Sequence, residues 1–156
     1  MKKIIYFFIF SFFLSSILIA SEKEIQVIDG DTIHIGKLKY RFFGIDAPET
    51  KQICEKDNIK IQCGVIAKNV LKNKIADKIP ECIVKDKDRY QRLVAECFIG
   101  KESLSRFMVR EGYAVAYSQY SKDFIEDEKY AKKNKLGIWS MNFQTPSEYR
   151  KSLRNK

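Results

Sequence analysis

Histidine is almost absent from this chain, because His34 is the only one among its 156 residues. A lone histidine lacks the partners that a hydrolytic triad needs, so we expect His34 to be an ordinary strand residue. No C-x-x-C pair occurs, and His34 lies far from every cysteine in the sequence, which argues against a zinc site. Internal repeats and low-complexity linkers are also missing, so the length fits one domain with accessory segments.

Long hydrophobic runs are missing too, except at the N-terminus. Lys2 and Lys3 precede an apolar run over residues 4–19, and the small residue Ala20 follows. This order predicts a secretory signal peptide at residues 1–20, because a bilayer-spanning helix needs about 20 apolar residues. An uncleaved anchor is the alternative, whereas a lipoprotein anchor is disfavoured because no cysteine lies near the boundary. The remaining chain is interpreted as one domain over residues 21–140 and a basic C-terminal tail over residues 141–156.

The charge balance is strongly basic. The formal net charge is +9, and it falls to +7 without the signal peptide because only Lys2 and Lys3 leave. Such an excess favours a polyanionic partner through long-range electrostatic steering. A solvated, lysine-rich surface is the plainer explanation, and the charge alone does not decide between the two.

All four cysteines lie in the predicted exported part: Cys54, Cys63, Cys82 and Cys97. An even number of cysteines in an oxidising compartment indicates disulfides, with three possible connectivities. Two predicted strands at residues 81–85 and 93–99 place Cys82 opposite Cys97 if they pair antiparallel. We therefore predict a cross-strand bridge there and a second bridge between Cys54 and Cys63.

Hydrophobic periodicity and turn signals divide the chain into short elements. Strands are predicted at residues 24–28, 32–35, 39–45, 81–85 and 93–99. Helices are predicted at residues 63–78, 103–111 and 124–135. The polar segment 49–62 is expected to be a loop, and the tail beyond Pro146 is either a short helix or frayed. The resulting fold class is α+β, a five-stranded OB-type β-barrel with three packed helices.

Three segments combine charged residues with turn signals: Val27-Ile28-Asp29-Gly30-Asp31-Thr32, Tyr40-Arg41-Phe42-Phe43-Gly44-Ile45-Asp46-Ala47-Pro48-Glu49-Thr50, and Asp88-Arg89-Tyr90-Gln91-Arg92. Each segment alone has an ordinary explanation as a turn, a strand end or a solvated hairpin loop. Together, in this order and spacing, they resemble the staphylococcal nuclease (thermonuclease) family. The similarity extends from about residue 25 to Trp139 and includes Gly64 and Ala67 as well as Leu136-Gly137-Ile138-Trp139.

The resemblance implies a calcium (Ca²⁺) site formed by Asp31, Asp46 and the backbone carbonyl of Ala47, with Asp29 as an outer-shell group. Hard oxygen ligands of this kind suit calcium and leave room for water and a phosphate oxygen. It also implies three catalytic residues: Arg41, Glu49 and Arg92. Two guanidinium groups match the charge and shape of a phosphate, and a glutamate can orient or deprotonate the attacking water.

The resemblance further assigns Arg89, Tyr90 and Tyr117 to the nucleotide pocket, where aromatic stacking tolerates any base. Tyr117 has an ordinary alternative as a core or rim tyrosine. One departure from the family pattern is Gln91, which stands where the family usually has glycine before the second arginine. If the backbone there has a positive φ, glutamine adds strain.

These observations lead to an enzyme hypothesis. The resemblance implies an exported, calcium-dependent endonuclease that cuts DNA or RNA with low sequence specificity and leaves 3′-phosphate ends. We expect a monomer, periplasmic or extracellular, without stable membrane association after signal cleavage. The alternatives are a non-catalytic OB-fold module that binds nucleic acid, and a surface protein that adsorbs polyanions through its basic residues.

Overall fold

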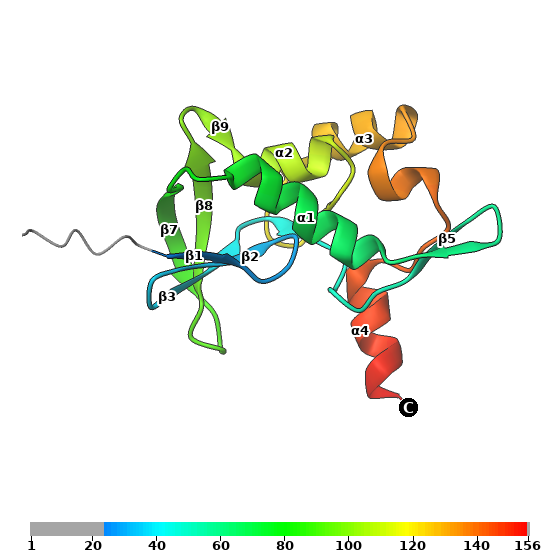
Figure 1. Cartoon of the computed structure of the whole chain (residues 1–156), viewed down its shortest axis with the longest axis horizontal. Coiled ribbons are helices and arrows are strands. Elements are labelled where there is room, and N and C mark those ends of the chain that lie inside the picture. The colour runs from blue at the N-terminus through cyan, green and yellow to red at the C-terminus, as the bar shows by residue number, and fades with distance from the viewer. Residues whose placement is uncertain (1–23, 156) are drawn as a thin grey trace, which may run out of the picture.

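The computed structural model describes residues 24–155, which form a mixed sheet with helices packed against it (Figure 1). The predicted signal peptide at residues 1–20 lies outside the described residues. Five strands follow one another across the sheet: β1 (Ile25–Val27), β2 (Thr32–Ile35), β3 (Leu38–Phe42), β8 (Leu93–Ile99) and β7 (Glu81–Lys87). A short strand, β9 (Glu102–Ser103), also pairs with β8.

The sheet is mixed because β3 and β8 run parallel, while the other pairs are antiparallel. Within residues 24–155, no strand pairing joins β7 back to β1. The α+β class is therefore confirmed, whereas a closed barrel is not shown.

The strand predicted at residues 39–45 is broken in the structure. Gly44 has a φ of +73°, a left-handed conformation that glycine adopts without steric cost, and it separates β3 from β4 (Ile45–Asp46). After this turn, β4 pairs with β10 (Val115–Ala116) instead of with the main sheet. The break brings Asp46 close to Asp31, because Arg41 contacts both carboxylates and the Ala47 N–H donates to Asp31.

The segment predicted as a loop at residues 49–62 contains a hairpin. Strands β5 (Cys54–Lys56) and β6 (Ile59–Ile61) pair antiparallel around Asp57 and Asn58, which both have positive φ. The loop prediction is wrong over residues 54–61. Asp and Asn tolerate the left-handed region, and two such residues in succession form a tight hairpin turn.

Four α-helices lie within the described residues, whereas three were predicted. They are α1 (Cys63–Ile75), α2 (Leu104–Arg110), α3 (Ile125–Lys133) and α4 (Pro146–Arg154), with a 3₁₀ turn η1 at Gly137–Ser140. The additional helix, α4, settles the choice left open for the tail after Pro146. It begins with a capping box, in which Thr145 and Glu148 exchange hydrogen bonds, and with Pro146 in its first turn.

The main core lies between the sheet and the first three helices. Its largest fully buried side chains include Ile33, Phe42, Leu71, Met108 and Phe124. Helix α1 contacts both β1 and α2, so it links the N-terminal strands to the C-terminal helices. Helix α4 lies apart from these three helices, at the lower right of Figure 1.

Both predicted disulfides are present. Cys82 lies opposite Cys97 in the β7–β8 pair, and Val84 lies opposite Ala95, which is the predicted register. The second disulfide joins Cys54 of β5 to Cys63, the first residue of α1. No cysteine of the described chain is left free.

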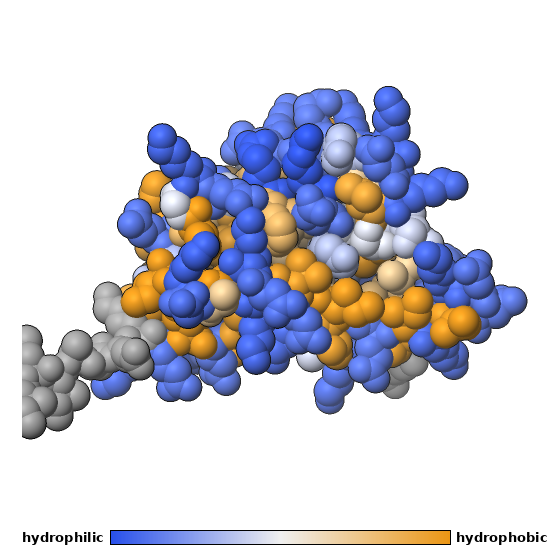
Figure 2. Space-filling model, turned by 45° about the horizontal axis from the view of Figure 1, so that its top comes forward, coloured by the Kyte–Doolittle hydropathy of each residue, from blue (hydrophilic) through white to orange (hydrophobic). Residues whose placement is uncertain are grey.

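Hydrophilic side chains cover much of the face shown in Figure 2, with hydrophobic residues gathered in a band along it. The exposed large hydrophobic residues include Ile53 and Ile59 around the β5–β6 hairpin and Ile83 and Val84 on β7. None of the helices in residues 24–155 has the length and apolar character required to cross a membrane.

Candidate active site

A groove of about 1070 Å³ collects the charged residues that the sequence singled out. Its lining includes every predicted catalytic residue, the predicted nucleotide-pocket residues, and the metal-site residues Asp31 and Ala47. The groove is bordered by the strand ends β2–β4, by the β7–β8 loop and by helix α4. The structure thus brings together residues that lie far apart in the sequence.

Asp31 is a buried carboxylate that lines the groove. It is buried at 5% exposure, and the backbone N–H of Ala47 donates a 2.7 Å hydrogen bond to its Oδ2. The hydroxyl of Thr32 donates to its Oδ1 at 3.0 Å. Burial raises the pKa of Asp31 to about 6, against the opposing effect of the Arg41 guanidinium and with a further upward contribution from the Asp29 carboxylate.

Asp46, the last residue of β4, lies beside Asp31, which directly precedes β2. Nη2 of Arg41 is 3.1 Å from Oδ1 of Asp46 and 3.2 Å from Oδ2 of Asp31, so both carboxylates face one nitrogen. Burial raises the pKa of Asp46, while a hydrogen bond from Arg150 lowers it. Two adjacent buried carboxylates require positive charge nearby, and Arg41 supplies part of it.

Glu49 is positioned through its backbone. Its N–H donates to Oε1 of the buried Gln52 at 3.3 Å, and Nε2 of Gln52 donates to the carbonyl of Gln144 at 2.7 Å. Gly64 in the first turn of α1 lies so close that an added Cβ would overlap the Glu49 carbonyl oxygen. Helix α1 and the segment before α4 therefore hold the loop that carries Glu49.

Arg92 enters the groove from the β7–β8 loop and is held by Asp88. Asp88 accepts hydrogen bonds from the backbone N–H of Arg92 at 2.9 Å and from its Nε at 2.8 Å. Burial alone would raise the pKa of Asp88, but these bonds and one from the Tyr90 N–H outweigh it and lower the pKa. Sequence reasoning quoted Asp88 in the motif without giving it a role. An acidic residue that opens a tight loop, with N–H donors two and four residues later, was the available signal.

Gln91 has a φ of +65°, so the suspected left-handed conformation is present. The Asp88 contacts nevertheless keep the Arg92 side chain at the groove, where its Nη1 lies 3.5 Å from the Thr32 hydroxyl.

Tyr90, Arg89 and Tyr117 lie on the groove as well. Tyr90 is 63% exposed, with the guanidinium carbons of Arg89 and Arg92 at 4.9 and 5.6 Å from its ring centre. Tyr117 meets Tyr120 edge to face at 4.8 Å between ring centres. Exposed rings beside cationic groups offer stacking surfaces for bases.

Arg150 of α4 is a site residue that the sequence reasoning missed. Its Nη2 donates to Oδ2 of Asp46 at 2.8 Å, and its Nη1 donates to Oδ1 of Asp46 at 3.0 Å and to Oε1 of Glu49 at 2.8 Å. The capping signature at Thr145–Glu148 is typical of a helix start. No local pattern indicated that this helix contacts Asp46 and Glu49, which lie about a hundred residues earlier in the sequence.

The donor set is chemically suited to a hard cation. Asp31 and Glu49 line the groove, whereas Asp46 is buried beside it, and Arg41 and Arg150 neutralise the three carboxylates. Within residues 24–155, no three His, Cys, Asp or Glu side chains are close enough to form a metal cage by themselves. The expected set has only two carboxylates and the Ala47 carbonyl, which leaves coordination places for water and phosphate oxygen.

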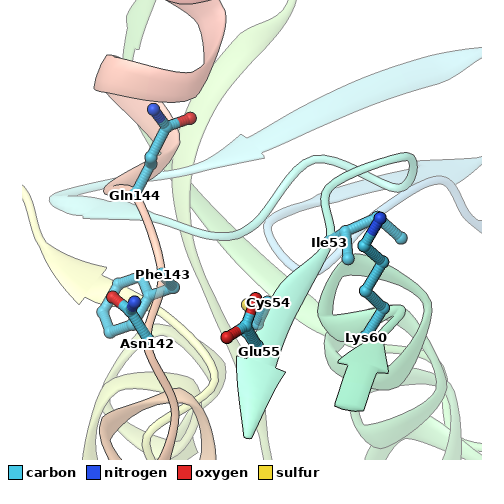
Figure 3. A pocket seen from close by; sticks show the side chains of 7 residues that line it. All are labelled: Ile53, Cys54, Glu55, Lys60, Asn142, Phe143 and Gln144. Atoms are coloured by element: carbon cyan, nitrogen blue, oxygen red, sulfur yellow. The ribbon is translucent and has the colours of Figure 1, made fainter. Parts of the chain in front are cut away.

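A second hollow, of about 270 Å³, lies away from these residues between the β5–β6 hairpin and the segment that leads into α4 (Figure 3). Glu55 and Lys60 of the hairpin and Asn142, Phe143 and Gln144 of that segment line it, together with Ile53 and Cys54. Glu55 and Asn142 also exchange two backbone hydrogen bonds. This hollow lies where the β5–β6 hairpin packs against residues 142–144, and none of the predicted catalytic residues lines it.

The mixed sheet and the groove define a small α+β domain that presents carboxylates and arginines side by side. Residues 39–141 match the model of the family described as staphylococcal nuclease homologue. The chain belongs to this family.

Individual relatives agree with this assignment. An uncharacterized endonuclease of Haemophilus influenzae is 31% identical over 137 residues, covering 83% of this chain and 72% of the relative. The thermonuclease of Staphylococcus hyicus is 34% identical over 130 residues, covering 76% of this chain and 75% of the relative. Endonuclease YhcR of Bacillus subtilis is 33% identical over 146 residues, which cover 80% of this chain but 12% of that longer protein. These nuclease relatives support an endonuclease function and a nucleic-acid substrate.

Proposed function

We propose that this protein is an exported, calcium-dependent endonuclease that hydrolyses phosphodiester bonds of DNA or RNA and leaves 3′-phosphate ends. The observation that carries the proposal is one groove lined by Asp31, Arg41, Glu49 and Arg92, with Asp46 buried against Arg41 and Arg150 beside it. A module that only binds nucleic acid has no use for two buried carboxylates beside an anionic ligand, because they would repel it without a cation.

The residues suit the steps of phosphodiester hydrolysis. Glu49, 37% exposed at its side chain, is accessible to orient the attacking water or accept its proton. Arg41 and Arg92 would donate hydrogen bonds to the phosphate oxygens as negative charge develops, and Arg92 would assist the departing 5′ oxygen. The water oxygen bonds to phosphorus, the bond to the 5′ oxygen breaks, and the phosphate stays on the 3′ oxygen. Calcium, bound by Asp31, Asp46 and the Ala47 carbonyl, would add positive charge and acidify the water.

Export and the domain limits belong to the same proposal. The two disulfides are consistent with an oxidising compartment, periplasmic or extracellular. We infer that residues 1–20 are a signal peptide that is removed and that the mature protein is a monomer. Residues 21–140 form the body of the nuclease domain, and the basic tail over residues 141–156 contributes α4, whose Arg150 reaches the groove.

Digestion of DNA and RNA by the purified mature protein tests the activity. We expect cleavage with calcium and none with a chelator. The polyanion-adsorbing alternative instead predicts binding that survives chelation and disappears with salt, without cleavage.

The variant Arg92→Lys tests the role of the second arginine. A lysine keeps the charge but cannot make paired contacts with a phosphate, so we expect turnover to fall by about 10²–10³-fold. Arg106→Lys is a matched control, because Arg106 pairs with Asp127 on the helical side and does not line the groove. Full activity of Arg92→Lys, measured as initial rates on DNA, would remove Arg92 from the mechanism.

A further inference from the structure

Helix α4 places the guanidinium group of Arg150 in the centre of the candidate active site. Arg150 spans Asp46 with two hydrogen bonds of 2.8 and 3.0 Å and reaches Glu49 with a third of 2.8 Å. The guanidinium thus occupies both oxygens of Asp46, a residue that is 1% exposed. Such a two-pronged contact between arginine and carboxylate is strong and directional.

The beginning of α4 is anchored independently of Arg150. The capping box of Thr145 and Glu148 starts the helix, the hydroxyl of Tyr149 donates to the Lys51 carbonyl at 3.3 Å, and Gln52 donates to the carbonyl of Gln144. The far end has fewer ties, since Leu153 is 52% exposed. The helix can therefore remain in place at its first turn when the Arg150 contacts are lost.

Arg150 and a divalent cation compete for the same carboxylates. Arg150 and Arg41 together use three of the roughly four lone-pair directions of the Asp46 carboxylate, and a cation bound there would also be repelled by the adjacent guanidinium groups. In contrast, Arg41 approaches Asp46 with a single nitrogen that it shares with Asp31.

We propose that Arg150 is an exchangeable counter-ion of the active site: it neutralises Asp46 and Glu49 in the cation-free protein and leaves Asp46 when calcium binds. This inference rests on the proposed function. It makes α4 part of the nuclease site, although the sequence suggested only a basic tail. The displaced guanidinium remains on the groove, where it is a third arginine available to a phosphodiester.

Calorimetric titration of calcium into the purified mature protein tests the exchange. In the wild type, calcium must break the charge-assisted hydrogen bonds of Arg150 in order to bind, whereas in Arg150→Ala these bonds are absent. We therefore expect the Kd of Arg150→Ala for calcium to be lower by about tenfold. Arg150→Gln keeps most of the side-chain length without the charge and is expected to change in the same direction. Lys151→Ala removes the same charge from an exposed position on the same helix, outside the groove, and is expected to leave the Kd within about twofold.

Hydrogen exchange of the wild-type protein provides a second readout. Calcium is expected to speed exchange in the last turn of α4 while exchange in α1 stays unchanged. If Arg150 only positions Asp46 and Glu49, we expect the opposite: calcium binding in Arg150→Ala is weaker or equal, and calcium does not change hydrogen exchange in α4.

Failure of the inference and failure of the proposed function give different results. Calcium binding with the same or a higher Kd in both Arg150 variants overturns the exchange and leaves the nuclease proposal standing. Calcium binding by neither the wild type nor the variants overturns both.

Discussion

At the scale of single residues, Gln91 is the clearest departure from the family pattern. Its φ of +65° is a left-handed backbone conformation, which glycine adopts without steric cost but which strains a residue with a Cβ. Asp88 still accepts hydrogen bonds from the backbone N–H and the Nε of the adjacent Arg92. The strain is therefore expected to lower stability more than activity.

The variant Gln91→Gly tests this interpretation. Relief of the left-handed strain is expected to raise the free energy of unfolding by about 1 kcal/mol, with turnover changed by less than about threefold. Lys135→Gly is a matched control, because Lys135 also has a positive φ, of 52°, and lies outside the groove. Denaturant unfolding and initial rates measure the two effects. A less stable Gln91→Gly protein would contradict the strain argument.

At the scale of elements, helix α1 determines the position of the catalytic loop. Gly64 leaves no space for a Cβ beside the Glu49 carbonyl, and Cys63 ties the same turn to β5 through its disulfide. Sequence reasoning placed the helix and its start correctly, because the apolar spacing of Ala67, Leu71 and Ile75 is a local property. It did not reveal the contact between Gly64 and Glu49, because that contact is made across the fold.

Gly64→Ala is expected to displace the loop of Glu49. The overlap must be relieved by a backbone shift, so we expect a loss of stability of about 1–3 kcal/mol and a lower turnover. Asn73→Ala, at an exposed position of the same helix, serves as the control. Thermal unfolding and initial rates should show both losses in Gly64→Ala and neither in the control. Wild-type turnover in Gly64→Ala would mean that the position of Glu49 does not depend on α1.

At the scale of the whole molecule, the two disulfides constrain different regions. One joins the central strand β8 to the terminal strand β7, and the other joins the β5–β6 hairpin to α1. A link that closes a loop of about 15 residues contributes roughly 3 kcal/mol by restricting the unfolded chain. The Cys82–Cys97 pairing was predictable because register in an antiparallel pair follows from the turn between the strands, and Cys54 and Cys63 were then the two cysteines that remained.

The double variant Cys82→Ser/Cys97→Ser is expected to lose about 3 kcal/mol of stability while retaining most of its activity under native conditions, since neither cysteine lines the groove. Denaturant unfolding of the oxidised wild type and the variant measures the difference. The wild type after reduction is the matched comparison, and it should lose stability as well. Equal stability of all three proteins would show that the cross-strand link does not restrict the unfolded chain.

The sequence by itself determined the α+β class, three of the four helices, the five strands β1, β2, β3, β7 and β8, the disulfide pairing and the residues expected at the site, because each follows from periodicity, turn chemistry or motif order along the chain. Only the tertiary structure decided the break at Gly44, the approach of Gly64 to Glu49, and the return of α4 to Asp46. Arg150 and Asp46 are 104 positions apart, and their contact depends on how the intervening strands and helices pack. No local pattern encodes such a contact, because the electrostatic attraction acts only after the core has brought the two ends of the domain together.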